Sequence, residues 1–367
     1  MERKRHVGVW ILVLTLGTVI AQDRDLHLKH QYHSGEISIP PASESEPFLR
    51  KFSPTLAVAY MEEGATAWTR ERKCLSCHTN GTYLVARPSL TRSLGRPSEE
   101  IRNFAVQQLK KFRSTDLEKL RSGIRPTQVA YLAQGLAEWD AHVTGKLSPE
   151  TEDALGLMLE VQGESGDWGN TDAWPPFESS NYQSTTVAAL AMATAPGWLA
   201  ARGQDGAVEK MKRYLQTGAP HDYGRLLLLW VSTRWPGLLE GEVKQALVEN
   251  VLGHQRKDGG WSIRSFAAPE EWGRGNRAEK LRSEDQFQDP PSDGHQTGLC
   301  LLVLRQAGVP AADPRLQRAV KWLLSHQRES GRWWTRSLNT DKFHFITYSG
   351  TCYPLLALDT CGLLAPR

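Results

Sequence analysis

Residues 73–81 carry the most distinctive chemical pattern in the chain, Lys-Cys-Leu-Ser-Cys-His-Thr-Asn-Gly. Two thiols, Cys74 and Cys77, are separated by two residues, and an imidazole, His78, follows directly. This Cys-x-x-Cys-His spacing is the attachment pattern of c-type haem, in which the thiols add to the two vinyl groups and the imidazole binds iron. The pattern predicts haem c as the cofactor and His78 as the proximal iron ligand.

Two other interpretations of this segment stay open. A disulfide between Cys74 and Cys77 would suit an oxidising compartment, and a zinc site would need at least one further ligand. For haem, none of Met158, Met192 and Met211 lies in a recognisable sixth-ligand segment. That leaves a five-coordinate iron or a ligand donated from elsewhere in the fold.

Asp293 and His295 form the second candidate site, in the stretch Ser-Asp-Gly-His-Gln-Thr-Gly at residues 292–298. A carboxyl and an imidazole can transfer protons or bind a metal ion, which makes both residues candidates for catalysis. An Asp ahead of an apolar helical run also commonly accepts hydrogen bonds from the N–H groups of the first turn. Analogous positions ahead of two other helices give further cap or cavity-rim candidates: Glu178, Tyr182, His344 and Tyr348.

The elements that must position these residues are helices. Apolar residues recur at helical spacing from Pro54 onward, Gly/Pro/Asp-rich connections separate the runs, and no alternating strand pattern of useful length is present. The longest connection, residues 262–291, is charged and aromatic, and a connection of that length favours a functional loop or rim. The pattern predicts an all-α chain.

The helical runs form a repeat. In each copy a Gln precedes a Trp by six residues, a Gly stands two residues before the Trp, and the next helix contains a Thr followed six and seven residues later by an apolar pair. Such self-similarity indicates stacked helical hairpins. The copies are Gln162 with Trp168 and Thr185, Gln255 with Trp261 and Thr297, and Gln327 with Trp333 and Thr351. In the first hairpin, ahead of Thr82, the Cys-x-x-Cys-His segment replaces the Gln and the Trp.

The Gln-x-x-x-Gly-x-Trp element resembles the QW repeat of the squalene-cyclase and prenyltransferase family. The resemblance covers roughly residues 55–365. It implies an α/α toroid, in which the hairpins close into a ring with their second helices inside. The alternative from the residues alone is an open α-solenoid, because stacked hairpins either run on or close.

The resemblance also bears on Asp293 and His295. In the bacterial squalene-hopene cyclases the corresponding stretch is Asp-x-Asp-Asp-Thr-Ala, whose middle Asp protonates an alkene. Asp293 and Thr297 match this stretch, whereas His295 and Gln296 replace the second and third Asp. Because an imidazolium of pKa about 6.5 is a poor acid for an alkene, ordinary protonation-initiated cyclisation is not expected. The prenyltransferase β subunits hold zinc on Asp, Cys and His nearby, so zinc on Asp293 and His295 is a second possibility.

The first residues predict export. A basic segment at residues 2–5 precedes an apolar run at 7–20, and Ala21 suits signal-peptidase cleavage. The run is shorter than the roughly 20 residues of a membrane-spanning helix, although retention as an anchor is the alternative. Removal of residues 2–5 takes +2 from the formal net charge of +3 and leaves about +1. This balance gives no electrostatic reason to expect nucleic-acid binding.

These observations divide the chain into a signal peptide (1–21), a linker or extended arm (22–46) and a single toroid domain (47–367) with the Cys-x-x-Cys-His motif in its first hairpin. We expect an extracytoplasmic, periplasmic-type protein with no integral membrane segment after cleavage.

Three functions follow from the sequence: a haem-bearing redox protein with an apolar, isoprenoid-like ligand and a redox partner; a terpene cyclase or isomerase with an altered acid motif; and a non-catalytic exported scaffold. In the haem-bearing protein, the inner helices of the toroid would all begin at one mouth of its central cavity. His295 or His344 would then lie near the haem and tune its properties.

Overall fold

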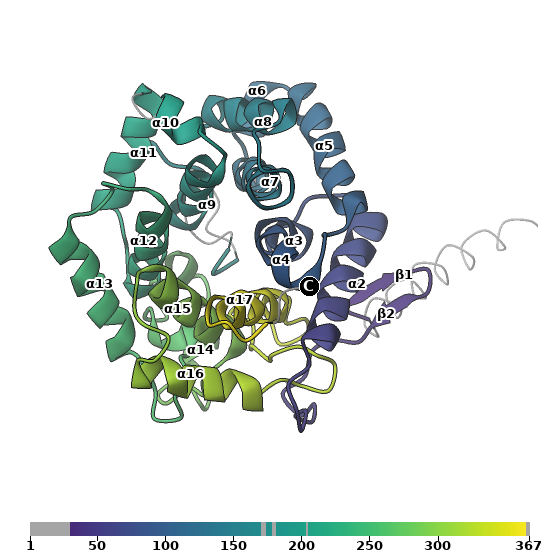
Figure 1. Ribbon diagram of the computed structural model, residues 1–367, viewed down its shortest axis with the longest axis vertical. Helices are drawn as coiled ribbons and strands as arrows, with labels where there is room; N and C mark the ends of the chain where they lie inside the picture. The colour runs from purple at the N-terminus through teal and green to yellow at the C-terminus, as the bar shows by residue number, and fades with distance from the viewer. Residues whose placement is uncertain (1–29, 170–173, 178–180, 203–204, 365–367) are drawn as a thin grey trace, which may run out of the picture.

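The computed structural model describes residues 30–169, 174–177, 181–202 and 205–364, which form a double ring of helices (Figure 1). The outer ring consists of α2 (Pro54–Arg72), α5 (Glu99–Arg113), α8 (Pro149–Glu160), α11 (Gly206–Thr217), α13 (Gly241–Gly253) and α16 (Pro314–Ser325). The inner ring consists of α3 (Asn80–Ala86), α7 (Arg125–Trp139), α9 (Asn181–Thr194), α12 (Asp222–Arg234), α15 (Gly294–Gln306) and α17 (Ile346–Thr360). The chain alternates between the rings, outer helix first.

The inner ring is closed. Each inner helix contacts the next in the order α3, α7, α9, α12, α15 and α17, and α17 contacts α3 and α2 at the start of the domain. The fold is therefore an all-α toroid, as predicted, and not an open solenoid. Every residue of α15 from Gly294 to Leu304 is buried, whereas the outer helices α11 and α16 bury only one stripe. A helix apolar on most sides needs neighbours on most sides, and the closed ring supplies them.

The hairpins with Gln and Trp share one set of hydrogen bonds. In the third, the Trp333 ring nitrogen donates to the Leu323 carbonyl of α16, and the Gln327 amide donates to the Gly331 carbonyl. The same amide also donates to the carbonyl of Ser53, which caps α2, and so joins the last outer helix to the first. The equivalent bonds of Trp168, Trp261, Gln162 and Gln255 tie each turn to its own helix and to the next outer helix.

The glycine of these turns is required by its conformation. Gly259 has φ +96, and a Cβ added there would lie 2.8 Å from the Arg318 carbonyl oxygen of the neighbouring outer helix. An L-residue would therefore meet both backbone strain and a clash.

Thr hydroxyls bind the turn of each copy of the repeat. The hydroxyls of Thr185 and Thr297 accept from the backbone N–H groups of Trp168 and Trp261. In the last copy the Thr347 hydroxyl accepts from the Thr335 N–H, and the Thr351 hydroxyl donates to the Thr347 carbonyl. Residues 334–345 form a longer connection there.

Of the expected linker or extended arm at residues 22–46, the structure describes residues 30–46, whereas residues 1–29, which include the predicted signal peptide, lie outside the described part. β1 (Tyr32–Ser34) and β2 (Ile37–Ile39) pair antiparallel, and β1 packs on α2 with the Tyr32 ring buried. The Glu46 carboxylate accepts from the Arg332 guanidinium at 3.1 Å and the Ser330 N–H at 2.7 Å. This segment is thus a packed arm rather than a solvated linker.

Short elements fill the remaining connections: η1 (Pro88–Leu90), α4 (Thr91–Leu94), α6 (Leu117–Leu120), η2 (Asp140–Thr144), α10 (Trp198–Arg202), η3 (Ile263–Ser265), η4 (Trp272–Gly275) and α14 (Ala278–Arg282). The last three belong to the long connection at 262–291. A buried ion pair between Arg264 and Glu284, at 2.6 Å, holds this connection together. The Arg264 guanidinium also donates to the carbonyls of Arg336 and Ser337.

None of the described helices combines the length and apolarity that a membrane span requires.

Replacing Trp261 with Ala should lower the free energy of unfolding by roughly 3 to 5 kcal/mol, because a fully buried indole and its hydrogen bond to α13 are lost. Trp174, whose side chain is 50% exposed, is the matched control, and Trp174→Ala should cost no more than about 0.5 kcal/mol. Urea unfolding of both variants measures the difference. A loss below about 1 kcal/mol for Trp261→Ala would contradict its packing role.

Candidate functional site

The Cys-x-x-Cys-His segment forms one wall of a cavity of about 440 Å³. Cys74, Cys77 and His78 all line it. The cavity lies where α3, α7 and α17 begin, so this segment is at the mouth of the inner ring. Five aromatic side chains contribute to the rest of the wall: Trp68, Trp174, Phe177, Phe343 and Phe345.

Hydrogen bonds fix the backbone of this segment. α2 ends at Lys73, which adopts a left-handed conformation with φ 52 and turns the chain toward the ring axis. The Cys74 carbonyl then accepts from the Trp68 ring nitrogen at 3.2 Å and from the Asn80 amide at 3.0 Å. The Cys77 carbonyl accepts from the Thr82 hydroxyl at 2.6 Å. Both cysteines therefore sit on a backbone anchored to the helices on either side.

The His78 ring is held between two aromatic side chains. It stacks on Phe345 and meets the edge of Trp68, each at 4.7 Å between centroids. Its Nδ1 atom hydrogen-bonds the Thr79 hydroxyl at 2.8 Å, and that hydroxyl also contacts the Tyr32 hydroxyl of the arm at 3.1 Å. Burial lowers the pKa of His78 to about 4. The imidazole is therefore neutral at neutral pH, and in the tautomer whose Nδ1–H donates to Thr79 the Nε2 atom carries the free lone pair.

Asp293 is the N-cap of α15. Its Oδ1 accepts from the Gln296 N–H at 2.8 Å, and its Oδ2 accepts from the Ile263 N–H at 2.7 Å. Burial raises the pKa of this carboxyl to about 6. Asp293 does not line the cavity of the Cys-x-x-Cys-His segment and borders only a separate space of about 30 Å³. Of the two sequence interpretations, the contacts correspond to helix capping.

His295 is fully buried behind the cavity wall. Its Nδ1 contacts the Ser349 hydroxyl at 2.7 Å and its Nε2 contacts the Tyr223 hydroxyl at 3.2 Å. Burial lowers its pKa to about 3. The ring packs at 5.8 Å against Phe177, which does line the cavity. Because both ring nitrogens are engaged, His295 does not present a ligand to the cavity.

The remaining rim candidates lie elsewhere. The His344 Nδ1 accepts from the Ser337 N–H, and the ring packs on Trp334. Neither His295 nor His344 is among the described residues that line the cavity, and their influence on a haem stays a prediction. The Tyr182 and Tyr348 hydroxyls donate to outer-ring carbonyls of Leu215 and Met61, which directs both phenols away from the mouth. Glu178 lies outside the described residues.

Sequence reasoning missed Gln128 and Arg277. The Gln128 amide donates to the Leu75 carbonyl at 2.7 Å, and Arg277 enters the cavity wall from the connection at 262–291. The length of that connection was the only signal for Arg277. Among the described residues, no three His, Cys, Asp or Glu side chains are grouped so that they could hold a metal ion.

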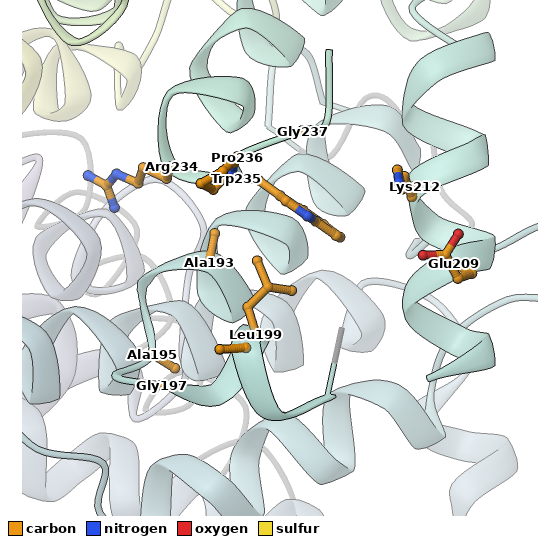
Figure 2. A pocket seen from close by; sticks show the side chains of 11 residues that line it. Ala193, Ala195, Gly197, Leu199, Glu209, Lys212, Arg234, Trp235, Pro236 and Gly237 are labelled. Carbon is orange, nitrogen blue, oxygen red and sulfur yellow. The ribbon is translucent and has the colours of Figure 1, made fainter. Parts of the chain in front are cut away.

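A second cavity, of about 620 Å³, lies at the other ends of α9 and α12 (Figure 2). Figure 2 shows Trp235 and Leu199 on one side and Glu209 and Lys212 of α11 on the other. The Arg234 guanidinium in its wall bonds the Glu138 carboxylate and the Thr194 hydroxyl. This cavity contains neither chemical motif.

No protein-family model matches the chain, and no curated protein sequence matches it. Among solved structures, it is similar to the apo form of the type II terpene cyclase MstE from Scytonema, at 13% identity and a TM-score of 0.46, over 82% of this chain and 96% of that one. A variant of MstE in complex with geranylgeranyl dihydroxybenzoate gives 12% identity and a TM-score of 0.49, over 84% and 96%. These are likenesses of overall fold.

Replacing Asp293 with Asn should remove a pH dependence of stability. The folded-state pKa of about 6 lies above the ordinary 3.8, so between these values the native chain keeps a proton that the unfolded chain has released. The free energy of unfolding of the parent should therefore fall as pH rises through this window, and that of Asp293→Asn should not.

The control is Asp313→Asn at the N-cap of α16. The Arg315 guanidinium lowers the pKa of Asp313, so this carboxylate contributes stability above its ordinary pKa that is lost at lower pH, the opposite sign. Urea unfolding between pH 4 and pH 7 covers the window of Asp293, whereas the window of Asp313 lies below pH 4. Asp313→Asn should therefore keep the parent's dependence of stability on pH in this range. Equal slopes for the parent and Asp293→Asn would contradict the burial argument.

Proposed function

We propose that this protein is an exported toroid that carries a c-type haem on Cys74, Cys77 and His78 and binds an apolar ligand beside it. One observation supports this most directly: both thiols and the imidazole line the same aromatic cavity. Its volume, about 440 Å³, falls within the range of about 300 to 1,000 Å³ of cofactor and ligand sites.

The surrounding residues fit the group. The His78 imidazole is neutral and hydrogen-bonded at Nδ1, the arrangement that leaves Nε2 for a metal. Trp68 and Phe345 fix the ring plane, and aromatic side chains line the cavity beside it. Bound haem would supply one-electron chemistry or a binding position for a small ligand at iron.

The cavity lining also limits which side chains could bind the haem iron. Among the described lining residues there is no Met and no second His. Of these lining residues, His78 would thus be the one to hold the iron, and a redox partner would dock near the exposed Trp174 side of the mouth. Export belongs to the same proposal, because c-type haem is attached outside the cytoplasmic membrane and residues 1–21 have the composition of a signal peptide.

A second candidate is a terpene cyclase or isomerase that works without haem. The observation that favours it is the aromatic wall itself, since aromatic faces stabilise cations and accommodate isoprenoid chains. Against it, the Asp293 carboxylate is occupied as a helix cap outside the cavity. Turnover of squalene or a shorter polyprene by haem-free protein would favour this candidate.

Co-expression with a cytochrome c maturation system tests the proposal. The parent should run on a denaturing gel as a band that stains for haem peroxidase activity, because thioether bonds survive denaturation. Cys361→Ser, a half-buried cysteine near the C-terminus, should stain equally, whereas the double variant Cys74→Ser/Cys77→Ser should not stain. An unstained parent beside a stained control cytochrome would overturn the haem assignment.

A further inference from the structure

The cavity is apolar but carries one charged side chain. Among its described lining residues, Arg277 alone is charged, and no Asp or Glu lines it. The Arg277 Nε donates to the Asn339 side-chain oxygen at 3.3 Å, and its Nη1 donates to the Asn276 carbonyl at 3.1 Å. The Asn339 amide in turn donates to the Pro175 carbonyl at 2.7 Å, so the guanidinium is braced by two loops of the mouth.

The neighbouring cations are satisfied by acids of the protein. Arg264 pairs with Glu284, Lys280 with Glu284, and Arg336 with Asp341. By contrast, both described partners of Arg277 are neutral oxygens. A guanidinium has five donors in a planar fork that matches a carboxylate, so Arg277 retains donors for a further acceptor at the cavity wall.

We propose that the cavity binds an apolar ligand that carries an anionic group, with the anion at Arg277 and the apolar body against the aromatic wall. This rests on the proposed function only in taking the cavity as the ligand site; it does not require haem. The shared chemistry is a carboxylate-like anion on an apolar body, which haem propionates and a separate apolar acid both offer. A partly buried guanidinium with no acidic partner among the described residues favours an anionic over a neutral ligand.

Two fluorescent probes of similar shape test the charge preference in haem-free protein. Anilinonaphthalene sulfonate is an apolar anion, and phenylnaphthylamine is its uncharged analogue. Arg277→Gln should weaken sulfonate binding about 10-fold or more, the usual effect of losing a charge-assisted hydrogen bond, and change the Kd of the neutral probe by less than about twofold.

Two variants control for net charge and for location. Arg282→Gln removes the same charge from an exposed position of the same connection and should leave both affinities unchanged. Trp174→Ala shortens an exposed side chain of the cavity wall and should weaken both probes. Equal losses of sulfonate binding in Arg277→Gln and Arg282→Gln, or sulfonate binding that Trp174→Ala leaves intact, would overturn the proposal.

Protein matured with haem distinguishes the two sources of the anion. Loss of sulfonate binding on haem attachment would support the proposal with the haem propionates as the anion. Retained binding that still depends on Arg277 would support it with a separate apolar acid as the ligand. Failure to attach haem would remove the haem assignment and leave the probe experiment valid.

Discussion

The structure depends on closure of the inner ring. A helical hairpin buries one side of each helix, and an inner helix such as α15, buried along almost its whole length, is satisfied only with neighbours on both sides. Packing of α17 on α2 and α3 completes the ring, and the Gln327 amide at the Ser53 carbonyl fixes the same junction from the outer side. The hairpin turns also depend on their neighbours in the ring. The side chains of Gln162 and Gln255 each donate from their turn to a carbonyl of the next outer helix.

Closure also creates the candidate site. The turns that lead into the inner helices converge on one mouth, so a turn with unusual chemistry faces its neighbours across a shared space. The first hairpin places Cys74, Cys77 and His78 at that position, whereas other hairpins place a packing Trp there. The long connections at 262–291 and 334–345 then fold over the mouth and add Arg277 and Phe345 to its wall. In such a repeat fold, the residues of each hairpin turn therefore decide which chemical groups line the cavity.

Features that repeat along the chain could be predicted from sequence, and features set by long-range packing could not. Trp261 and Trp333 were predicted as core residues because their spacing recurs, and both are fully buried. The bond between Thr347 and Thr335 could not be predicted, because it crosses a connection that is longer than in the other copies. The polar arm looked solvated because two buried side chains, Tyr32 and Ile39, give no visible periodicity. His295 was expected at the rim, but side-chain direction depends on neighbours 54 and 72 residues away in sequence.

The central claim is that Cys74, Cys77 and His78 form a covalent haem site, and mass spectrometry of one peptide tests it most directly. Trypsin should release residues 74–92 from protein matured in the presence of a cytochrome c maturation system, because Arg87 precedes Pro88 and is spared. The account predicts that this peptide carries one haem through two thioether bonds. The same peptide recovered with two unmodified thiols, or lighter by two hydrogens as a Cys74–Cys77 disulfide, would contradict it.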